Sequence, residues 1–132
     1  MNIFGIGTDI VNVERIKKSM KNKIFIERIF NKKEILKCKN IKSKCNCFAK
    51  RFAAKEAFSK ALGTGISNGI KLSEIVILNN KLGKPYIFLT GQTKKILKKK
   101  FKGKKSKFSL SLADEKNYAV AFVTISLWIR IK

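Results

Sequence analysis

The chain opens with an alternating apolar segment that predicts a β-strand. Over residues 2–8, "NIFGIGT", Ile3, Gly5 and Gly7 share one face, and the residues between them share the other. Glycine inside a strand often marks the close approach of another backbone or of a ligand. We expect this strand to end at Asp9.

After this strand, the apolar residues in the first half of the chain recur at helical spacing. Val13, Ile16 and Met20 recur at the spacing of one helix face. The predicted segments are a helix near 12–20, one or two short helices within 24–38, a polar connector over 39–44 and a long helix over 44–62. Gly63 and Gly65 suit the C-terminal cap of the long helix and the turn beyond it.

In the second half of the chain, alternating patterns typical of strands appear again. The predicted segments are a strand pair over 74–80 and 84–90 joined through 81–83, a basic helix over 91–101, and two strands over 107–113 and 117–129 with a turn at 114–116. No repeat and no long linker divides the chain. These patterns predict one domain over 1–132 of the α+β class, with helices packed on a largely antiparallel sheet.

Composition narrows the class of protein. An apolar content of 45% supports a core, and no apolar run reaches the roughly 18 residues that a membrane span needs. The N-terminus lacks the basic and cleavage regions of a signal peptide, so we expect a cytoplasmic protein. The odd count of cysteines (Cys38, Cys45 and Cys47) and the absence of histidine argue against a disulfide framework and a zinc site. We expect three free thiols.

The charge indicates anionic partners without choosing among them. Lysine and arginine number 31 against 8 acidic residues, a formal charge of +23. Such a field attracts nucleic acid, phosphorylated small molecules, acidic proteins or acidic lipids. Part of the excess has a simpler origin, because an AT-rich genome also produces solvated lysines that need no function.

The long helix carries the first candidate for chemistry. One face is predicted to be core (Phe48, Phe52, Ser59 and Leu62), and a second stripe runs beside it (Ala49, Ala53, Glu56 and Lys60). Glu56 and Lys60 form either an ordinary surface pair at i,i+4 spacing or part of a site. The alanines favour a site, since a solvated stripe in a lysine-rich chain rarely stays so small.

Asp9 is the second candidate. It is either the N-cap of the following helix or a ligand for a hard cation together with Glu56. Mg²⁺ commonly takes one or two carboxylates, keeps several waters and binds phosphate oxygens. The turn "GTGISNG" after the long helix can bring backbone N–H groups near phosphate, although it matches neither the Walker pattern nor the dinucleotide fingerprint.

Two linked motifs carry a family resemblance. "GIGTDIVNVERI" near the start and "RFAAKEAFSKALGTGI" in the middle resemble the 4′-phosphopantetheinyl transferase family, in particular its short, single-domain branch, the holo-acyl carrier protein synthases. The similarity runs from about residue 2 to 125 and includes the tail "SLSLADEKNYAVAFV". The final "SLWIRIK" has no counterpart that we can place.

The resemblance implies a reaction and roles for named residues. Phosphopantetheine moves from coenzyme A to a serine of apo acyl carrier protein, in support of fatty acid biosynthesis, and adenosine 3′,5′-bisphosphate leaves. Asp9 and Glu56 are expected to hold Mg²⁺, with Mn²⁺ as the alternative, and Glu56 and Lys60 to serve catalysis. The residues expected near coenzyme A are Lys55, Lys60, Gly63, Thr64, Gly65 and Ser111.

The family also implies its partners. Acyl carrier proteins are acidic, and the expected docking residues are Arg15, Lys17, Lys21 and Arg28. The short branch assembles as a homotrimer with sites between subunits, for which the apolar "YAVAFVTI" would suit a buried interface. Many members have a histidine near the position of Asp114; this chain has none, which leaves a metal-bound water, Glu56 or the phosphate as the general base.

Two other classes of protein remain as alternatives. A small RNA-binding protein would use the charge and the ten phenylalanines, yet no recognised RNA-binding motif is present. A protein that only docks acyl carrier protein would not need the pair of Asp9 and Glu56. We expect neither a membrane nor a nucleic acid as partner.

Overall fold

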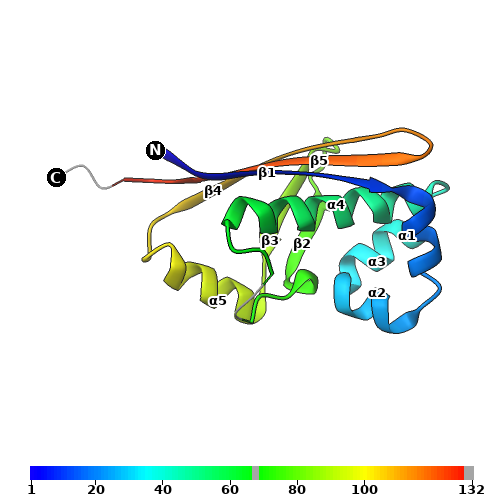
Figure 1. The fold of residues 1–132 in the computed structure, drawn as a ribbon, viewed down its shortest axis with the longest axis horizontal. Helices are drawn as coiled ribbons and strands as arrows, with labels where there is room; N and C mark the ends of the chain where they lie inside the picture. Colours follow the sequence, from blue (N-terminus) through cyan, green and yellow to red (C-terminus); the bar gives the residue numbers. More distant parts are fainter. Residues whose placement is uncertain (67–68, 130–132) are drawn as a thin grey trace.

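The structure is a computed structural model that describes residues 1–66 and 69–129 (Figure 1). In chain order its elements are β1 (Asn2–Asn12), α1 (Val13–Ser19), α2 (Lys23–Ile29), α3 (Lys32–Lys39), α4 (Lys44–Leu62), the 3₁₀ turn η1 (Leu72–Glu74), β2 (Ile75–Asn79), β3 (Pro85–Leu89), α5 (Gly91–Lys100), β4 (Ser106–Asp114) and β5 (Tyr118–Leu127). Antiparallel sheets with helices packed against them confirm the α+β class.

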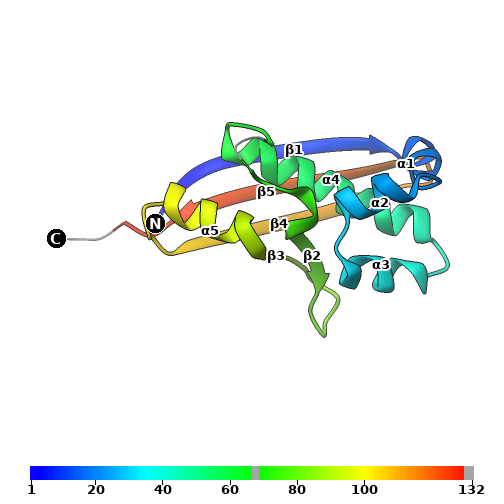
Figure 2. The same cartoon turned by 90° about the horizontal axis from the view of Figure 1, so that it is seen from below.

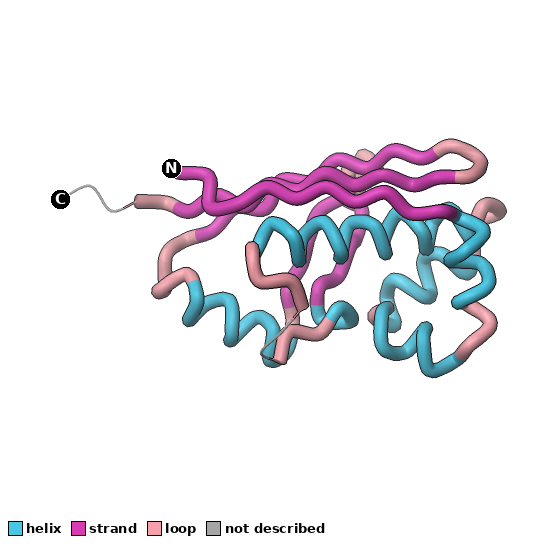
Figure 3. Tube along the Cα trace, viewed as in Figure 1, coloured by secondary structure: helices cyan, strands magenta, loops and turns pink. Residues whose placement is uncertain are grey.

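A three-stranded antiparallel sheet forms one layer of the molecule, in the order β1-β5-β4. All the helices lie on one side of this sheet, as Figures 1 and 3 show. The opposite side, which we call the outer sheet face, carries the apolar side chains Ile6, Ile10, Val120 and Phe122, all exposed. The inner side carries the residues that alternate with them, such as Val11 and Ala121, which are buried.

Helix α4 is the central element of the core. It runs beneath β1 and β5 (Figure 2) and buries Ala53, Ala57 and Phe58 completely. Its bounds match the predicted 44–62. It ends at Gly63, which adopts the left-handed conformation with φ of 81°, as the C-terminal glycine predicts.

The three short helices after β1 confirm the pattern of the first half, and asparagines begin each of them. The side chains of Asn12, Asn22 and Asn31 accept hydrogen bonds from backbone N–H groups in the first turns of α1, α2 and α3. Asn12 therefore caps α1, so the alternative in which Asp9 is the N-cap is wrong.

Strand β1 differs from the prediction in its length and its alternation. It continues four residues past Thr8, because it pairs with β5 from Asn2↔Leu127 to Asn12↔Tyr118. Asp9 is thus inside the strand rather than at its end. A register shift between Ile3 and Gly5 breaks the alternation, and Phe4 packs edge-to-face against Phe101 with ring centroids 5.2 Å apart.

The remaining strands β2 and β3 form a separate two-stranded sheet rather than joining the first. The side chain of Asn80 holds their turn by accepting from the N–H groups of Leu82 and Lys84. The strand and helix predictions of the second half are otherwise confirmed to within about two residues. Within residues 1–66 and 69–129, no helix is long and apolar enough to cross a bilayer.

Candidate functional site

The glycines of β1 and the alanines of α4 bring two backbones into contact. A Cβ added to Gly7 would lie 1.9 Å from Ala57 O, and one added to Gly5 would lie 1.9 Å from Ala61 O. Only hydrogen fits at these positions. The small residues of "FAAKEAFSKALG" therefore make room for β1, and the close approach places Asp9 of the strand beside the end of the helix.

Asp9, Glu56 and Lys60 gather where β1 crosses α4, and we call them the acid site. Asp9 shares the inner face of β1 with Gly7 and Val11. Lys60 Nζ lies 3.1 Å from Asp9 Oδ1 and donates to Thr8 O at 3.0 Å. The side chain of Lys60 is 56% exposed and that of Asp9 is 16% exposed, so the ammonium group lies at the rim of the site.

The electrostatics indicate that Glu56 lies close to Asp9. Burial raises the pKa of Glu56 above its ordinary value, and the charge of Asp9 raises it further. Lys60 and then Arg15 act in the opposite direction on the same pKa. A partly buried carboxylate whose charge is disfavoured by a second carboxylate would be stabilised by a cation between the two.

The donor set of the acid site fits Mg²⁺ better than a transition metal. Among the residues that the structure describes, no cluster of three or more His, Cys, Asp or Glu side chains could hold a metal. The protein thus offers two carboxylates, Asp9 and Glu56, which is the number that Mg²⁺ commonly takes when water and substrate phosphate complete its shell.

Lys55 does not belong to this site, and its predicted contact with coenzyme A is not supported. The side chain is completely buried, and its ammonium donates to Glu34 Oε1 at 2.6 Å, to Leu72 O at 2.8 Å and to Ile75 O at 2.6 Å. These contacts use all three donors of the ammonium group. Burial lowers the pKa of Lys55 to about 8, against the opposing effect of Glu34. Lys55 ties α4 to α3 and β2 instead.

The turn after α4 is open to a ligand over its described part. Gly63 and Gly65 have φ of 81° and 65°, and no atom lies within 4 Å of a Cβ added at either position. Thr64 between them is exposed. The turn lies just beyond Lys60, as predicted. Residues 67–68 of the segment "GTGISNG" lie outside the described residues, as do 130–132 of "SLWIRIK".

Ser111 lies on the opposite side of the sheet from the acid site of the same chain. Its neighbours Leu110 and Leu112 pack against the core, so Ser111 belongs to the outer sheet face, where it pairs with Phe122. The prediction that Ser111 lines the same cleft as Asp9 is therefore wrong within one chain, because the alternation of β4 points the two side chains to opposite faces.

The four predicted docking residues are exposed on α1, on α2 and between them: Arg15, Lys17, Lys21 and Arg28. Arg15 is the one whose charge acts on Glu56. Its guanidinium therefore belongs to the surroundings of the acid site. Arg28 lines a separate hollow between α2 and η1, together with Glu27 and Lys71.

A basic hollow of about 510 Å³ was not predicted from the sequence. Its lining includes Lys37, Lys50, Arg51, Asn79 and Asp114, from α3, α4, β2 and β4. Arg51 is only 4% exposed, donates to Asn79 Oδ1 at 2.7 Å, and has an Nε without a hydrogen-bond partner in the described chain. The available signal was an arginine directly before Phe52, in a chain whose cations are mostly lysine.

The cysteines also correct a prediction. Cys38 of α3 and Cys47 of α4 form a disulfide, with Cα atoms 5.5 Å apart, and Cys45 is free. The prediction of three free thiols is wrong for this pair, because the packing of α3 against α4 brings together two cysteines that are nine residues apart. Arg51 donates to Cys47 Sγ at 3.2 Å, which joins the disulfide to the basic hollow.

Comparison with known proteins identifies the family of the chain. A family model described as the 4′-phosphopantetheinyl transferase superfamily matches residues 5–123. The chain is 51% identical over 125 residues to a holo-[acyl-carrier-protein] synthase of Pelagibacter ubique, a match that covers 95% of this chain and 98% of the relative.

Solved structures show the same fold. The crystal structure of holo-[acyl-carrier-protein] synthase from Neisseria meningitidis has a TM-score of 0.84 and 40% identity, covering 94% of this chain and 98% of that one. A holo-(acyl-carrier-protein) synthase from Bacillus anthracis in complex with CoA (3′,5′-ADP) has a TM-score of 0.77 and 34% identity, covering 95% and 97%. The chain belongs to the 4′-phosphopantetheinyl transferase superfamily.

Proposed function

We propose that this protein is a holo-acyl carrier protein synthase, a transferase that moves phosphopantetheine from coenzyme A to a serine of apo acyl carrier protein. The observation that carries the proposal is the acid site, in which Asp9, Glu56 and Lys60 of the two family motifs meet at the crossing of β1 and α4. The relative from Bacillus anthracis, in complex with CoA (3′,5′-ADP), supports coenzyme A as the donor. The alternative of an RNA-binding protein gains no support from the relatives described above.

Asp9 and Glu56 are the residues that would hold Mg²⁺, with Mn²⁺ as the alternative. Burial raises the pKa of Glu56 most, and repulsion from the charge of Asp9 raises it further. A bound cation would relieve this repulsion. When bound, the metal supplies charge neutralisation for the pyrophosphate of coenzyme A.

The reaction needs little covalent chemistry from the protein. The serine oxygen of the carrier forms a bond to the phosphorus that bears pantetheine, the bond from that phosphorus to adenosine 3′,5′-bisphosphate breaks, and the serine loses its proton. Phosphoryl transfer depends mainly on positioning and charge stabilisation. Lys60 uses two of its three N–H donors on Thr8 and Asp9, so the third can contact a phosphate oxygen. The Gly63–Gly65 turn, Thr64 included, lies beside it.

The acidic carrier protein would dock on the surface of Arg15, Lys17, Lys21 and Arg28. The exposed cations of α1 and α2 complement an acidic partner and would steer its approach more than they set its final affinity. Since the charge of Arg15 acts on Glu56, docking there brings the target serine to the acid site.

We further propose a homotrimer with sites between subunits, built from single-domain chains in the cytoplasm. The exposed apolar outer sheet face favours burial against another copy. Ser111, on the outer sheet face, could then reach an acid site only in a neighbouring subunit.

One assay tests the function. The protein is incubated with coenzyme A, Mg²⁺ and an apo acyl carrier protein, and the carrier is analysed by mass spectrometry. We expect the mass to increase by one phosphopantetheine group, and we expect Asp9→Asn to abolish the increase. A carrier whose mass does not change with the wild-type protein would contradict the proposal, and an RNA-binding or merely docking protein would give that result.

A further inference from the structure

The second half of the chain concentrates positive charge at one end of the molecule. Residues 94–107 contain nine of the 27 lysines of the chain and no acidic residue. We call these nine the lysine end: Lys94, Lys95, Lys98, Lys99, Lys100, Lys102, Lys104, Lys105 and Lys107. All nine are exposed, and within the described chain none forms a salt bridge with a carboxylate. A lysine bias spread evenly over 132 residues would place about three in such a window, so composition alone does not explain it.

This concentration has a cost for the helix that carries it. Lys94 and Lys98, and likewise Lys95 and Lys99, stand four residues apart on α5, and like charges at this spacing destabilise a helix. The lysines of the last turn gain something from the helix dipole, but those of the first turns do not. An anionic surface facing α5 would remove the repulsion.

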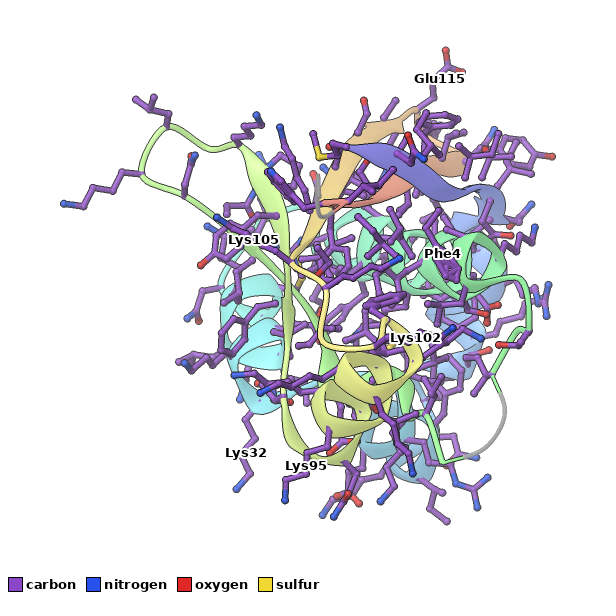
Figure 4. All side chains as sticks on the ribbon, turned by 90° about the vertical axis from the view of Figure 1, so that its left-hand side faces the viewer. Phe4, Lys32, Lys95, Lys102, Lys105 and Glu115 are labelled. Atoms are coloured by element: carbon purple, nitrogen blue, oxygen red, sulfur yellow. A yellow bond between two sulfur atoms is a disulfide. The ribbon has the colours of Figure 1, made fainter. Side chains whose placement is uncertain are left out.

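Exposed apolar groups lie among these lysines. Trp128 and Ile129 are 39% and 47% exposed and line an open hollow of about 720 Å³ with Lys102, Lys104 and Lys105. The backbone N–H of Trp128 donates to Lys105 O at 2.9 Å, and Lys105 Nζ lies 5.1 Å from the Trp128 ring centroid. Figure 4 shows Lys95, Lys102 and Lys105 on the side of the molecule where α5 faces the viewer, far from Glu115 of the β4–β5 turn.

A second hollow extends the apolar surface. It measures about 400 Å³ and lies between β3, α5 and the start of β4, lined by Phe88, Leu97, Phe101 and Phe108 with Lys94, Lys98 and Lys104 at the same place. Phe88 is 45% exposed. Lys104 borders both hollows, so the lysines and the two apolar surfaces form one continuous region.

We propose that the lysine end docks on the surface of a bilayer that contains anionic phospholipid. Clustered lysines bind an anionic leaflet at roughly 1 kcal/mol each, and an amphipathic indole is suited to the boundary between headgroups and acyl chains. The helix itself does not insert, because its apolar residue Leu97 and the neighbouring Thr93 are buried in the protein. The contact is peripheral, with Trp128 and Ile129 as the apolar anchor.

The composition of the region favours lipid over RNA. Single-stranded nucleic acid binds a basic groove in which several aromatic rings stack on successive bases. Here the exposed rings are Trp128 and Phe88, which line different hollows rather than one groove. The Trp128 ring already carries the ammonium of Lys105, and Phe101 is buried at 4% exposure. The proposal does not rest on the proposed function, since α5 and the docking surface on α1 lie at opposite ends of the molecule (Figure 1).

Vesicle binding tests the proposal, and Trp128 supplies a readout of its own because it is the single tryptophan of the chain. The full-length protein is sedimented with vesicles of phosphatidylcholine alone or with about 30% phosphatidylglycerol, at about 50 and about 300 mM salt. We expect binding only to the anionic vesicles, weakening at high salt, and a blue shift of the tryptophan emission on binding.

A pair of matched variants separates this surface from general charge. Lys95→Gln/Lys99→Gln/Lys102→Gln removes three lysines of the lysine end, and Lys32→Gln/Lys33→Gln/Lys42→Gln removes three exposed lysines elsewhere. At about fivefold for each lysine, the first variant should partition on the order of 100-fold more weakly, and the second should bind nearly as the wild type does.

Three results would overturn the proposal. One is an absence of binding to anionic vesicles at low salt. Another is equally weakened vesicle binding in the two variants, which would mean that binding depends only on the net charge of the protein. The third is tighter binding to single-stranded RNA than to vesicles, lost in the first variant, which would assign the surface to nucleic acid. Because neither variant changes the acid site, transfer activity with soluble carrier protein reports separately on the proposed function.

Discussion

At the scale of single residues, the role of each side chain in the acid site depends on which side chains from other elements lie beside it. Glu56 and Lys60 have the spacing of an ordinary surface pair, but Lys60 contacts Asp9 of β1 instead. Glu56 in turn has its pKa raised first by burial and then by Asp9. A contact between elements that are about fifty residues apart in sequence thus decides the role of each of the three side chains.

The first prediction concerns the charge of Glu56. The pKa of Glu56 is higher in the folded than in the unfolded state, so its ionised carboxylate opposes folding. The protonated form stabilises the fold, and this stability is lost as the pH rises through the folded-state pKa. Glu56→Gln should therefore not lower the melting temperature of the metal-free protein at neutral pH. It should abolish the increase that Mg²⁺ causes in the wild type, and reduce transfer by orders of magnitude.

Thermal unfolding with and without Mg²⁺ measures the first effect, and the mass assay measures the second. Glu115→Gln is the control, because Glu115 is an exposed acid in the β4–β5 turn. If Mg²⁺ stabilised Glu56→Gln as much as the wild type, Glu56 would not be a metal ligand.

The second prediction contrasts two lysines of one motif. Lys55→Met leaves the buried carboxylate of Glu34 without its cation, and breaking a buried pair costs about 3–5 kcal/mol. Lys60→Met affects a side chain that is 56% exposed, where the change in stability should stay within about 0.5 kcal/mol. Urea unfolding should thus separate the two, and Lys60→Met should be folded but poor in transfer. Equal stability of both variants would contradict the assignment of Lys55 to the core.

At the scale of elements, local signals predicted the helices and the strands of the second half, but not the length of β1. The bounds of α4 follow from its own residues, which end in a glycine that takes the left-handed conformation. The length of β1 follows from its partner β5, more than a hundred residues away, and the sequence of 2–8 does not contain that information. A helical wheel likewise uses only the residues of one helix. It therefore found the stripe of Glu56 and Lys60 but could not show that Lys55 pairs with Glu34 of α3.

The third prediction concerns the start of α5. The N-cap residue Thr90 makes no side-chain capping bond, and the carboxylate of Glu74 accepts from the N–H groups of Gln92 and Thr93 and from the Thr93 hydroxyl. Burial acts to raise the pKa of Glu74, but these hydrogen bonds outweigh it, and the pKa is lowered. The stabilisation is therefore present above the unfolded pKa and lost as the pH falls through the folded-state pKa.

Glu74→Gln tests this at constant side-chain size. It should lower the free energy of unfolding by about 1 kcal/mol at neutral pH, as loss of a helix cap does. The difference from the wild type should shrink toward zero as the pH falls through the folded-state pKa of Glu74. A difference that stayed constant across this range would mean that the charge of Glu74 contributes nothing.

At the scale of the whole molecule, the acid site, Ser111 and the basic hollow lie on different elements of one chain. The acid site lies at the inner face of β1, Ser111 lies on the outer sheet face, and Arg51 lines the basic hollow near the start of α4. The sequence motifs identified the acid site, but the arrangement of these surfaces depends on the layering of the sheet over α4. If coenzyme A contacts both the acid site and Ser111, it must bind between subunits, because the two lie on opposite faces of the sheet. We propose that the basic hollow belongs to the same shared site.

The last prediction tests that arrangement by mixing two inactive variants. Glu56→Gln removes the metal carboxylate, and Arg51→Gln removes the guanidinium of the basic hollow, so each homogeneous trimer should transfer poorly. In mixed trimers formed by co-expression, a site between Glu56 of one subunit and Arg51 of its neighbour is intact in about one quarter of cases, from random assembly. The mixture should therefore recover about one quarter of the wild-type activity. If each site were built within one chain, every subunit would carry one defect and no activity would return, while circular dichroism of each variant shows that both are folded.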